Sequence, residues 1–306
     1  MPALITFFTI IYTIIDDYCK EILPRYLASK PGVKPVLSDS ELICLSLSQD
    51  LLGFSSQRYF LRFMKNNYLY LFPDLIHQSQ YNRRLRNLSR IINLLREKIV
   101  KDLLFHLSSE RILDTTPLPV CNLKRSFGKQ TAFKGYASVG KCAAKDVKYF
   151  GFKLVLLINK NGIPIRFNLV PANTAEIKTI DSVIDENSQN LVIFSDKGFV
   201  SKKVAQDLKE QQNIDLITPR KKYRESRQPL PKWLNQYHKK SCRLIETVNG
   251  ILKDQFNLEK HYCKTLWGLC TKVISKMTAF TLGQFINVQN NLPILQLKNF
   301  AFVNYY

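Results

Sequence analysis

The sequence feature that most constrains the fold is a change of pattern at Glu110. Before it, the spacing of apolar residues predicts helices; after it, short β-rich apolar runs alternate with turns and helical segments. A first short strand is predicted at residues 111–113. Residues 149–158 and 163–170 are apolar runs on either side of a Gly-containing turn, which predicts a β-hairpin.

The segments after the hairpin alternate between helix and strand. We expect helices at 174–186, 201–211 and about 239–256, and strands at 191–195 and 214–218. Three antiparallel strands followed by two strands reached through helices is the ribonuclease H-like arrangement, and a generic α/β domain is the alternative. The predicted fold class is α/β: a ribonuclease H-like mixed sheet with flanking helices, preceded by an all-helical N-terminal domain.

The N-terminal part shows helix-start signals. Ser38 and Glu41 have the spacing of a capping box, which predicts a helix to Leu51 that Gly53 ends. Ser55 or Ser56 can cap a second helix to about residue 64, and a long arginine-rich helix is expected at about 80–106. These helices suit either a DNA-binding module of helix-turn-helix kind or an ordinary helical bundle with a solvated basic face.

Three domains are therefore predicted. They are a helical N-terminal domain at 1–109, a ribonuclease H-like domain at 110–290 and a C-terminal tail at 291–306. The apolar start MPALITFFTIIYTII is shorter than the ~20 residues that a membrane-spanning helix needs, so we expect a buried or interface helix and no membrane association. Seven scattered cysteines without a CxxC pair favour a reduced, cytoplasmic compartment.

Charge narrows the class of partner. The chain has 45 Lys and Arg against 24 Asp and Glu, a formal net charge of +21. Most of this excess belongs to residues 111–306. An excess of this size favours a polyanionic partner over mere solubility, and nucleic acid is the first candidate.

Three acidic residues stand out by position. Asp114 follows the first predicted strand, Asp196 ends the fourth, and Glu246 belongs to the later helix. In the expected sheet order the first and fourth strands are neighbours, which brings the two aspartates together. Because clustered carboxylates repel one another, a site of this kind favours divalent cations, which serve phosphoryl transfer in pairs. Taken singly, each residue is as well explained as a turn, cap or solvated residue.

The neighbours of Glu246 strengthen the metal-site hypothesis. Arg243, Glu246, Asn249, Gly250 and Lys253 share one helical face at about 100° per residue. This pattern fits a metal ligand between phosphate-binding cations, or else a solvated surface charge pattern. Further basic residues, interleaved with aromatics, fill residues 220–240 and suit contact with a nucleic-acid backbone, or else form a basic insertion.

Around these residues the chain resembles a known family. The motifs ILDTTPLPVC, KYFGFKLVLL, GIPIRFNLVPANTAEI, LVIFSDKGF, LITPRKK and RLIETVNGILKDQF, in this order, resemble bacterial insertion-sequence transposases of the DDE class. The nearest group looks like the family conventionally numbered nine hundred eighty-two, and the resemblance covers about residues 10–288. It implies that Asp114, Asp196 and Glu246 form a catalytic triad binding two Mg²⁺ ions, for which Mn²⁺ can substitute. Glu176 departs from the family, in which an Asp is common.

The resemblance also implies the reaction and the partners. The expected activity is DNA strand cleavage and strand transfer at the ends of an insertion sequence, by a homo-oligomer assembled on DNA. The alternatives are a nuclease or resolvase on the same fold, and a non-catalytic DNA-binding protein, either a decayed copy or a regulator. The expected DNA contacts are basic: Arg243, Lys253, Lys197, Arg220, Lys221, Lys222 and Arg224.

Overall fold

The chain forms two compact units. The computed structural model describes residues 2–27, 35–103, 108–126, 133–142, 146–186, 188–219 and 230–297. Contacts group Leu104–Ile251 into one unit, here the sheet unit, and group Met1–Leu103 with Leu252–Tyr306 into the other, here the helical unit. Residues 252–290 thus pack with the N-terminal helices, although the sequence placed them with the sheet. The functional boundaries at 109 and 290 stay predictions.

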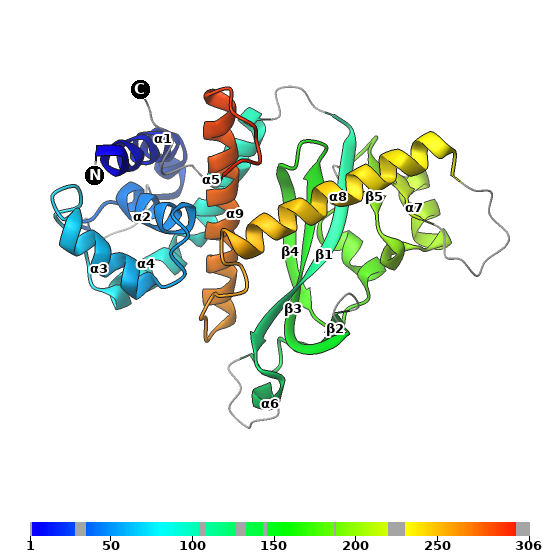
Figure 1. Ribbon diagram of the computed structural model, residues 1–306, viewed down its shortest axis with the longest axis horizontal. Helices are drawn as coiled ribbons and strands as arrows, with labels where there is room; N and C mark the ends of the chain where they lie inside the picture. The colour runs from blue at the N-terminus through cyan, green and yellow to red at the C-terminus, as the bar shows by residue number, and fades with distance from the viewer. Residues whose placement is uncertain are drawn as a thin grey trace. The chain divides into compact units, whose positions relative to one another are not determined.

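The sheet unit has the predicted mixed sheet (Figure 1). Its order is β2-β3-β1-β5-β6, and β4 also pairs with β3. Strands β1, β2, β3 and β4 pair antiparallel, whereas β5 pairs parallel with both β1 and β6. The predicted adjacency of the first and fourth strands is therefore confirmed, and with it the ribonuclease H-like fold class. The strands are β1 (Glu110–Cys121), β2 (Ser138–Cys142), β3 (Val147–Asn159), β4 (Pro164–Pro171), β5 (Val192–Ser195) and β6 (Asp215–Ile217).

Strand β1 is much longer than the three residues predicted. It continues past Leu113 through two prolines, Pro117 and Pro119, to Cys121. Strand β5 pairs with β1 only up to Leu113, while β3 accompanies β1 to Cys121. Beyond Leu113, β1 has no strand on its β5 side within the described residues. Such an edge tolerates proline, because a backbone nitrogen that faces the edge takes no part in the hydrogen bonds of the sheet.

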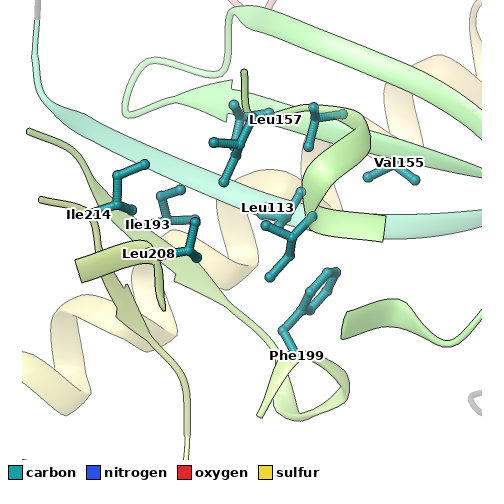
Figure 2. Packing of buried hydrophobic residues seen from close by; sticks show 10 residues of the cluster. Leu113, Val155, Leu157, Ile193, Phe199, Leu208 and Ile214 are labelled. Carbon is teal, nitrogen blue, oxygen red and sulfur yellow. The ribbon is translucent and has the colours of Figure 1, made fainter. Parts of the chain in front are cut away.

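The two faces of the sheet are covered differently. On one face an apolar cluster joins Leu113, Val155 and Ile193 to residues of η1 (Glu176–Ser182), η2 (Lys197–Phe199) and α7 (Lys202–Gln212). Figure 2 shows side chains of this cluster, among them Leu113 and Phe199. Side chains alternate along a strand, so Asp114 belongs to the opposite face. Helix α8 (Lys232–Asp254) crosses that face (Figure 1).

Two further local predictions for the sheet unit were wrong. The helix expected at 174–186 is the 3₁₀ helix η1, in which the hydroxyls of Thr179 and Ser182 donate to carbonyl oxygens three residues earlier. Helix α8 begins at Lys232 and therefore includes part of the basic segment at 220–240. Gly140 lies in the middle of strand β2. That strand lies so close to Ala172 that a Cβ on Gly140 would overlap its backbone.

The helical unit begins as predicted. Its helices are α1 (Pro2–Leu27), α2 (Asp39–Leu51), α3 (Gln57–Asn67), α4 (Gln78–Asn87), α5 (Ser89–Leu103) and α9 (Leu266–Gln289). The capping box is confirmed: the Glu41 amide donates to Ser38 Oγ at 3.1 Å, and the Ser38 amide donates to Glu41 Oε2 at 2.6 Å. Gly53, just after α2, has φ +71°, a left-handed backbone conformation that favours glycine and does not continue the helix.

The long helix predicted at 80–106 is instead two helices, α4 and α5, separated at Leu88. The flanking Asn87 and Ser89 are residues whose side chains compete with the backbone for hydrogen bonds, which weakens a helix there. Helix α9 packs against both α2 and α5. Helix α1 buries Phe8, Ile11 and Ile15. Within the described part of the chain, we find no helix with the length and apolarity required to span a membrane.

Candidate active site

The parallel pairing of β1 and β5 brings two aspartates together. Leu113 of β1 lies opposite Ser195 of β5, and Asp114 and Asp196 are the residues that follow this pair. Asp114 continues within β1, whereas Asp196 begins the turn into η2. Because parallel strands end at the same edge of a sheet, both carboxylates belong to the C-terminal edge of β5.

Helix α8 is fixed to this face by contacts along its length. Tyr237 donates a hydrogen bond from its hydroxyl to Glu110 Oε2 at 2.7 Å, and its ring lies 5.3 Å from that of Phe194. His238 Nε2 lies 2.9 Å from the Ser195 carbonyl oxygen, next to Asp196. Farther along, Asn249 Nδ2 donates to Asp114 Oδ2 at 3.0 Å. Glu246 precedes Asn249 by three residues, so the helix carries it to the two aspartates.

The charges of neighbouring acidic residues act on the carboxylate of Asp114. Burial is the main cause that raises the pKa of Asp114 from its ordinary 3.8 to about 7. The negative charges of Glu176, Asp196 and Glu246 contribute to this rise, and the Thr115 backbone amide opposes it. The structure therefore places Glu176, Asp196 and Glu246 within electrostatic range of Asp114, and we call these four carboxylates the acidic cluster.

The thiol of Cys242 borders the same cluster. Burial, followed by the charges of Asp196, Asp114 and Glu246, raises the pKa of Cys242 to about 11. A thiol with so high a pKa stays protonated near neutral pH and is a poor nucleophile. The cluster therefore fits carboxylate chemistry, and Cys242 takes no part in it as a nucleophile.

Sequence reasoning did not assign a site role to Glu176 or Asn249. Thr115 Oγ1 donates to Glu176 Oε1 at 3.0 Å, and the Glu176 carboxylate occupies the space that a Cβ on Gly198 would need. The only signal for Glu176 was its place after the Ala-Asn pair. Asn249 was visible as a member of the helix face of Glu246, but its hydrogen bond to Asp114 depends on how α8 crosses the sheet.

The donor set fits a hard divalent cation. Every candidate ligand is an oxygen, and the buried Asn249 Oδ1 has no hydrogen-bond partner among the described residues. In the described chain, no three His, Cys, Asp or Glu side chains are gathered closely enough to hold a metal ion already. The charges of the carboxylates thus act on one another, but the carboxylates do not form a complete set of metal ligands. Repulsion between like charges favours such a spacing.

The predicted basic contacts divide into three groups. Lys197 and Arg243 are exposed; Lys197 directly follows Asp196, and Arg243 lines a cavity of about 400 Å³ with Lys160 and Lys240. Lys253, on the last turn of α8, has its ammonium 3.7 Å from Glu259 Oε1. The remaining predictions lie outside the described residues: Arg220, Lys221, Lys222 and Arg224.

Comparison with known proteins identifies the family. A family model described as Transposase DDE domain matches residues 107–265, just over half of the chain, and spans Asp114, Asp196 and Glu246. No curated protein and no solved structure gives a significant match. Together with the ribonuclease H-like sheet, the matched region shows that this chain belongs to the transposase DDE domain family, as a transposase of the DDE class.

Proposed function

We propose that this protein cleaves DNA at the ends of an insertion sequence and transfers the freed strand to target DNA. The observation that carries the proposal is the acidic cluster at the sheet edge. Asp114 and Asp196 come from neighbouring parallel strands, and Glu246 joins them from α8. The formal net charge of +21 supports DNA as the substrate.

The metal ligands in this proposal are Asp114, Asp196 and Glu246. They would hold two Mg²⁺ ions, or Mn²⁺ in their place. When bound, such ions polarise the phosphodiester and offset the charge that develops during phosphoryl transfer. Asn249 supports this role because its amide fixes one oxygen of Asp114.

The chain's other contribution is to bind and orient DNA. In the first step a water oxygen bonds to phosphorus, the bond from phosphorus to the 3′ oxygen breaks, and that oxygen takes up a proton. In the second step the new 3′-hydroxyl bonds to a target phosphorus and displaces another 3′ oxygen. Neither step needs a covalent bond to the protein, so alignment and charge neutralisation supply the catalysis.

Basic residues of the chain suit the DNA backbone. The proposed contacts are Arg243, Lys253, Lys197, Arg220, Lys221, Lys222 and Arg224. The helical unit is proposed as a second DNA-binding part, since α3 carries exposed Arg58, Arg62 and Lys65 at helical spacing. Joining two element ends requires two active sites at one place, so we propose a homo-oligomer on DNA.

The test is cleavage of a labelled duplex carrying the terminal repeat of the element that encodes the protein. We expect Mg²⁺-dependent nicking at the repeat boundary, no nicking in EDTA, and no nicking by Glu246→Gln, which keeps the size of the side chain. Asp254→Asn is the matched control, because Asp254 is an exposed carboxylate on the same helix.

Added target DNA separates the alternatives. Joined products support a transposase, whereas cleavage without joining indicates a nuclease or resolvase on the same fold. Specific binding without cleavage in Mg²⁺ or Mn²⁺ would refute the proposed catalysis and favour a non-catalytic DNA-binding protein. Nicking by Glu246→Gln at the wild-type rate would refute the role of Glu246.

A further inference from the structure

The helical unit contains a cavity where three helices begin. Its volume is about 400 Å³, and it is lined at the starts of α3, α4 and α9 by Ser56, Gln78 and Thr265 among others. Helix α4 contacts both α3 and α9. At about 30 Å³ for each water molecule in the liquid, the space is equivalent to roughly thirteen waters, enough for a hydrated phosphate group.

Helix starts favour anions. The first backbone amides of a helix have no partner within it, and the helix dipole adds a partial positive charge at this end. Ser56 and Thr265 cap α3 and α9, yet each side chain accepts only one amide hydrogen, from Tyr59 and Gly268 respectively. Three such ends at one cavity make it a site of positive potential.

The side chains that line the cavity add to this potential. Four of the described lining residues are cationic and none is acidic; the cations are Arg58, Arg86, Lys264 and Lys272. The Arg86 guanidinium lies 5.6 Å from the centre of the Trp267 ring, at the first turn of α9. A stacked guanidinium keeps its edge donors free, and Arg recognises phosphate in this way.

Two buried donors at this cavity have no acceptor. Lys272 Nζ and Gln57 Nε2 have almost no exposed surface and make no hydrogen bond within the described residues. Among the charges that act on Lys272, that of Asp50 has the largest effect; Asp50 Oδ1 accepts from Lys276 Nζ at 2.7 Å, and Asp50 Oδ2 has no hydrogen-bond partner among the described residues. The two buried nitrogens present no surface for a ligand to touch, so Lys272 contributes to the cavity through its positive charge, which adds to that of the helix starts.

We propose that this cavity binds a phosphate group. A phosphate offers several acceptor oxygens and negative charge, which together match the helix starts and the cationic lining of the cavity. The source we expect is one backbone phosphate of duplex DNA, and this part rests on the proposed function. A free phosphate ion has the same chemistry and is the other source.

The test compares variants of the full chain in EDTA, so that cleavage does not enter the result. Lys272→Met removes the buried ammonium while keeping an unbranched chain. Arg58→Ala changes an exposed residue at the rim and does not threaten the fold. Lys101→Met is the matched control, because Lys101 is exposed on α5 and does not line the cavity.

Two measurements separate the sources. The first is the thermal midpoint in potassium phosphate against potassium chloride at equal ionic strength. The second is the affinity for a short labelled duplex over a range of salt concentrations. A lost phosphate contact lowers the slope of log affinity against log salt by about 0.9.

We expect phosphate to raise the midpoint of wild-type protein and of Lys101→Met, and to lose this effect in Lys272→Met. A smaller salt slope in Lys272→Met and Arg58→Ala identifies the ligand as a DNA phosphate. Phosphate stabilisation with an unchanged slope identifies a free anion. If both variants match Lys101→Met in both measurements, the proposal is overturned, whether or not the protein cuts DNA.

Discussion

Replacing Asp114 by Asn should make the metal-free protein more stable at pH 8. In the folded chain the Asp114 carboxylate is desolvated and lies near the charges of Glu176, Asp196 and Glu246. Asparagine removes the charge and keeps an oxygen that can accept the hydrogen bond from Asn249. The substitution therefore relieves repulsion without removing the contact between β1 and α8.

The magnitude follows from the pKa of Asp114. Its rise from 3.8 to about 7, at about 1.4 kcal/mol for each tenfold change in proton affinity, sets an upper limit of about 4 kcal/mol on the cost of ionised Asp114. Between these two pH values the folded state holds a proton that the unfolded state has lost. The free energy of unfolding therefore falls as pH rises through this window and levels off above pH 7.

The assay is thermal unfolding in EDTA at pH 4, 6 and 8 for wild-type protein and Asp114→Asn. For a domain of this size, 1 kcal/mol corresponds to about 2–4 °C, so we expect the variant's midpoint at pH 8 to be higher than that of wild type, by at most about 8–16 °C. The advantage should shrink toward pH 4. Mg²⁺ should stabilise wild-type protein more than the variant. A thermal midpoint of the variant at pH 8 equal to or below that of wild type would refute the electrostatic reasoning.

Two further predictions concern single contacts. Asn249→Ala should weaken Mn²⁺ binding and slow cleavage, because it frees Asp114 to move, and it should lower the thermal midpoint, because a contact between α8 and β1 is lost. Titration calorimetry with Mn²⁺ checks the binding, Asn249→Asp should not rescue it, and unchanged Mn²⁺ affinity would contradict the prediction. Asp50→Ala should lower the free energy of unfolding by about 3–5 kcal/mol, because it leaves Lys276 buried with only the Phe256 carbonyl as acceptor. Chemical denaturation measures this loss, exposed Asp74→Ala is the control, and equal midpoints for the two variants would exclude the pair as a stabilising contact.

Local sequence signals predicted the structure correctly where interactions within a few residues determine the backbone conformation. The Ser38 and Glu41 capping box and the hairpin turn at Gly162 occur as predicted, and the helix expected at 201–211 forms as α7. Each depends on hydrogen bonds or backbone angles within a few residues. The same locality explains the errors, since β1 extends through two prolines only because β3 pairs with it on one side.

The sequence by itself determined the fold class and the positive net charge of the chain, and it singled out the three acidic residues that we propose as metal ligands. Strand and helix periods, and the order in which they occur, are properties of neighbouring residues. Asp114 and Asp196 could be paired in advance because adjacent parallel strands bring their ends together.

Only the tertiary structure decided what surrounds those residues. Glu176 reaches the cluster through the 3₁₀ turn η1, and Asn249 reaches Asp114 because α8 crosses that face of the sheet. Likewise, only the folded structure shows that Lys272 is buried without a hydrogen-bond partner among the described residues, beside the cavity at the starts of α3, α4 and α9. Desolvation and charge coupling depend on distances between segments far apart in the chain, and no local pattern in the sequence encodes those distances.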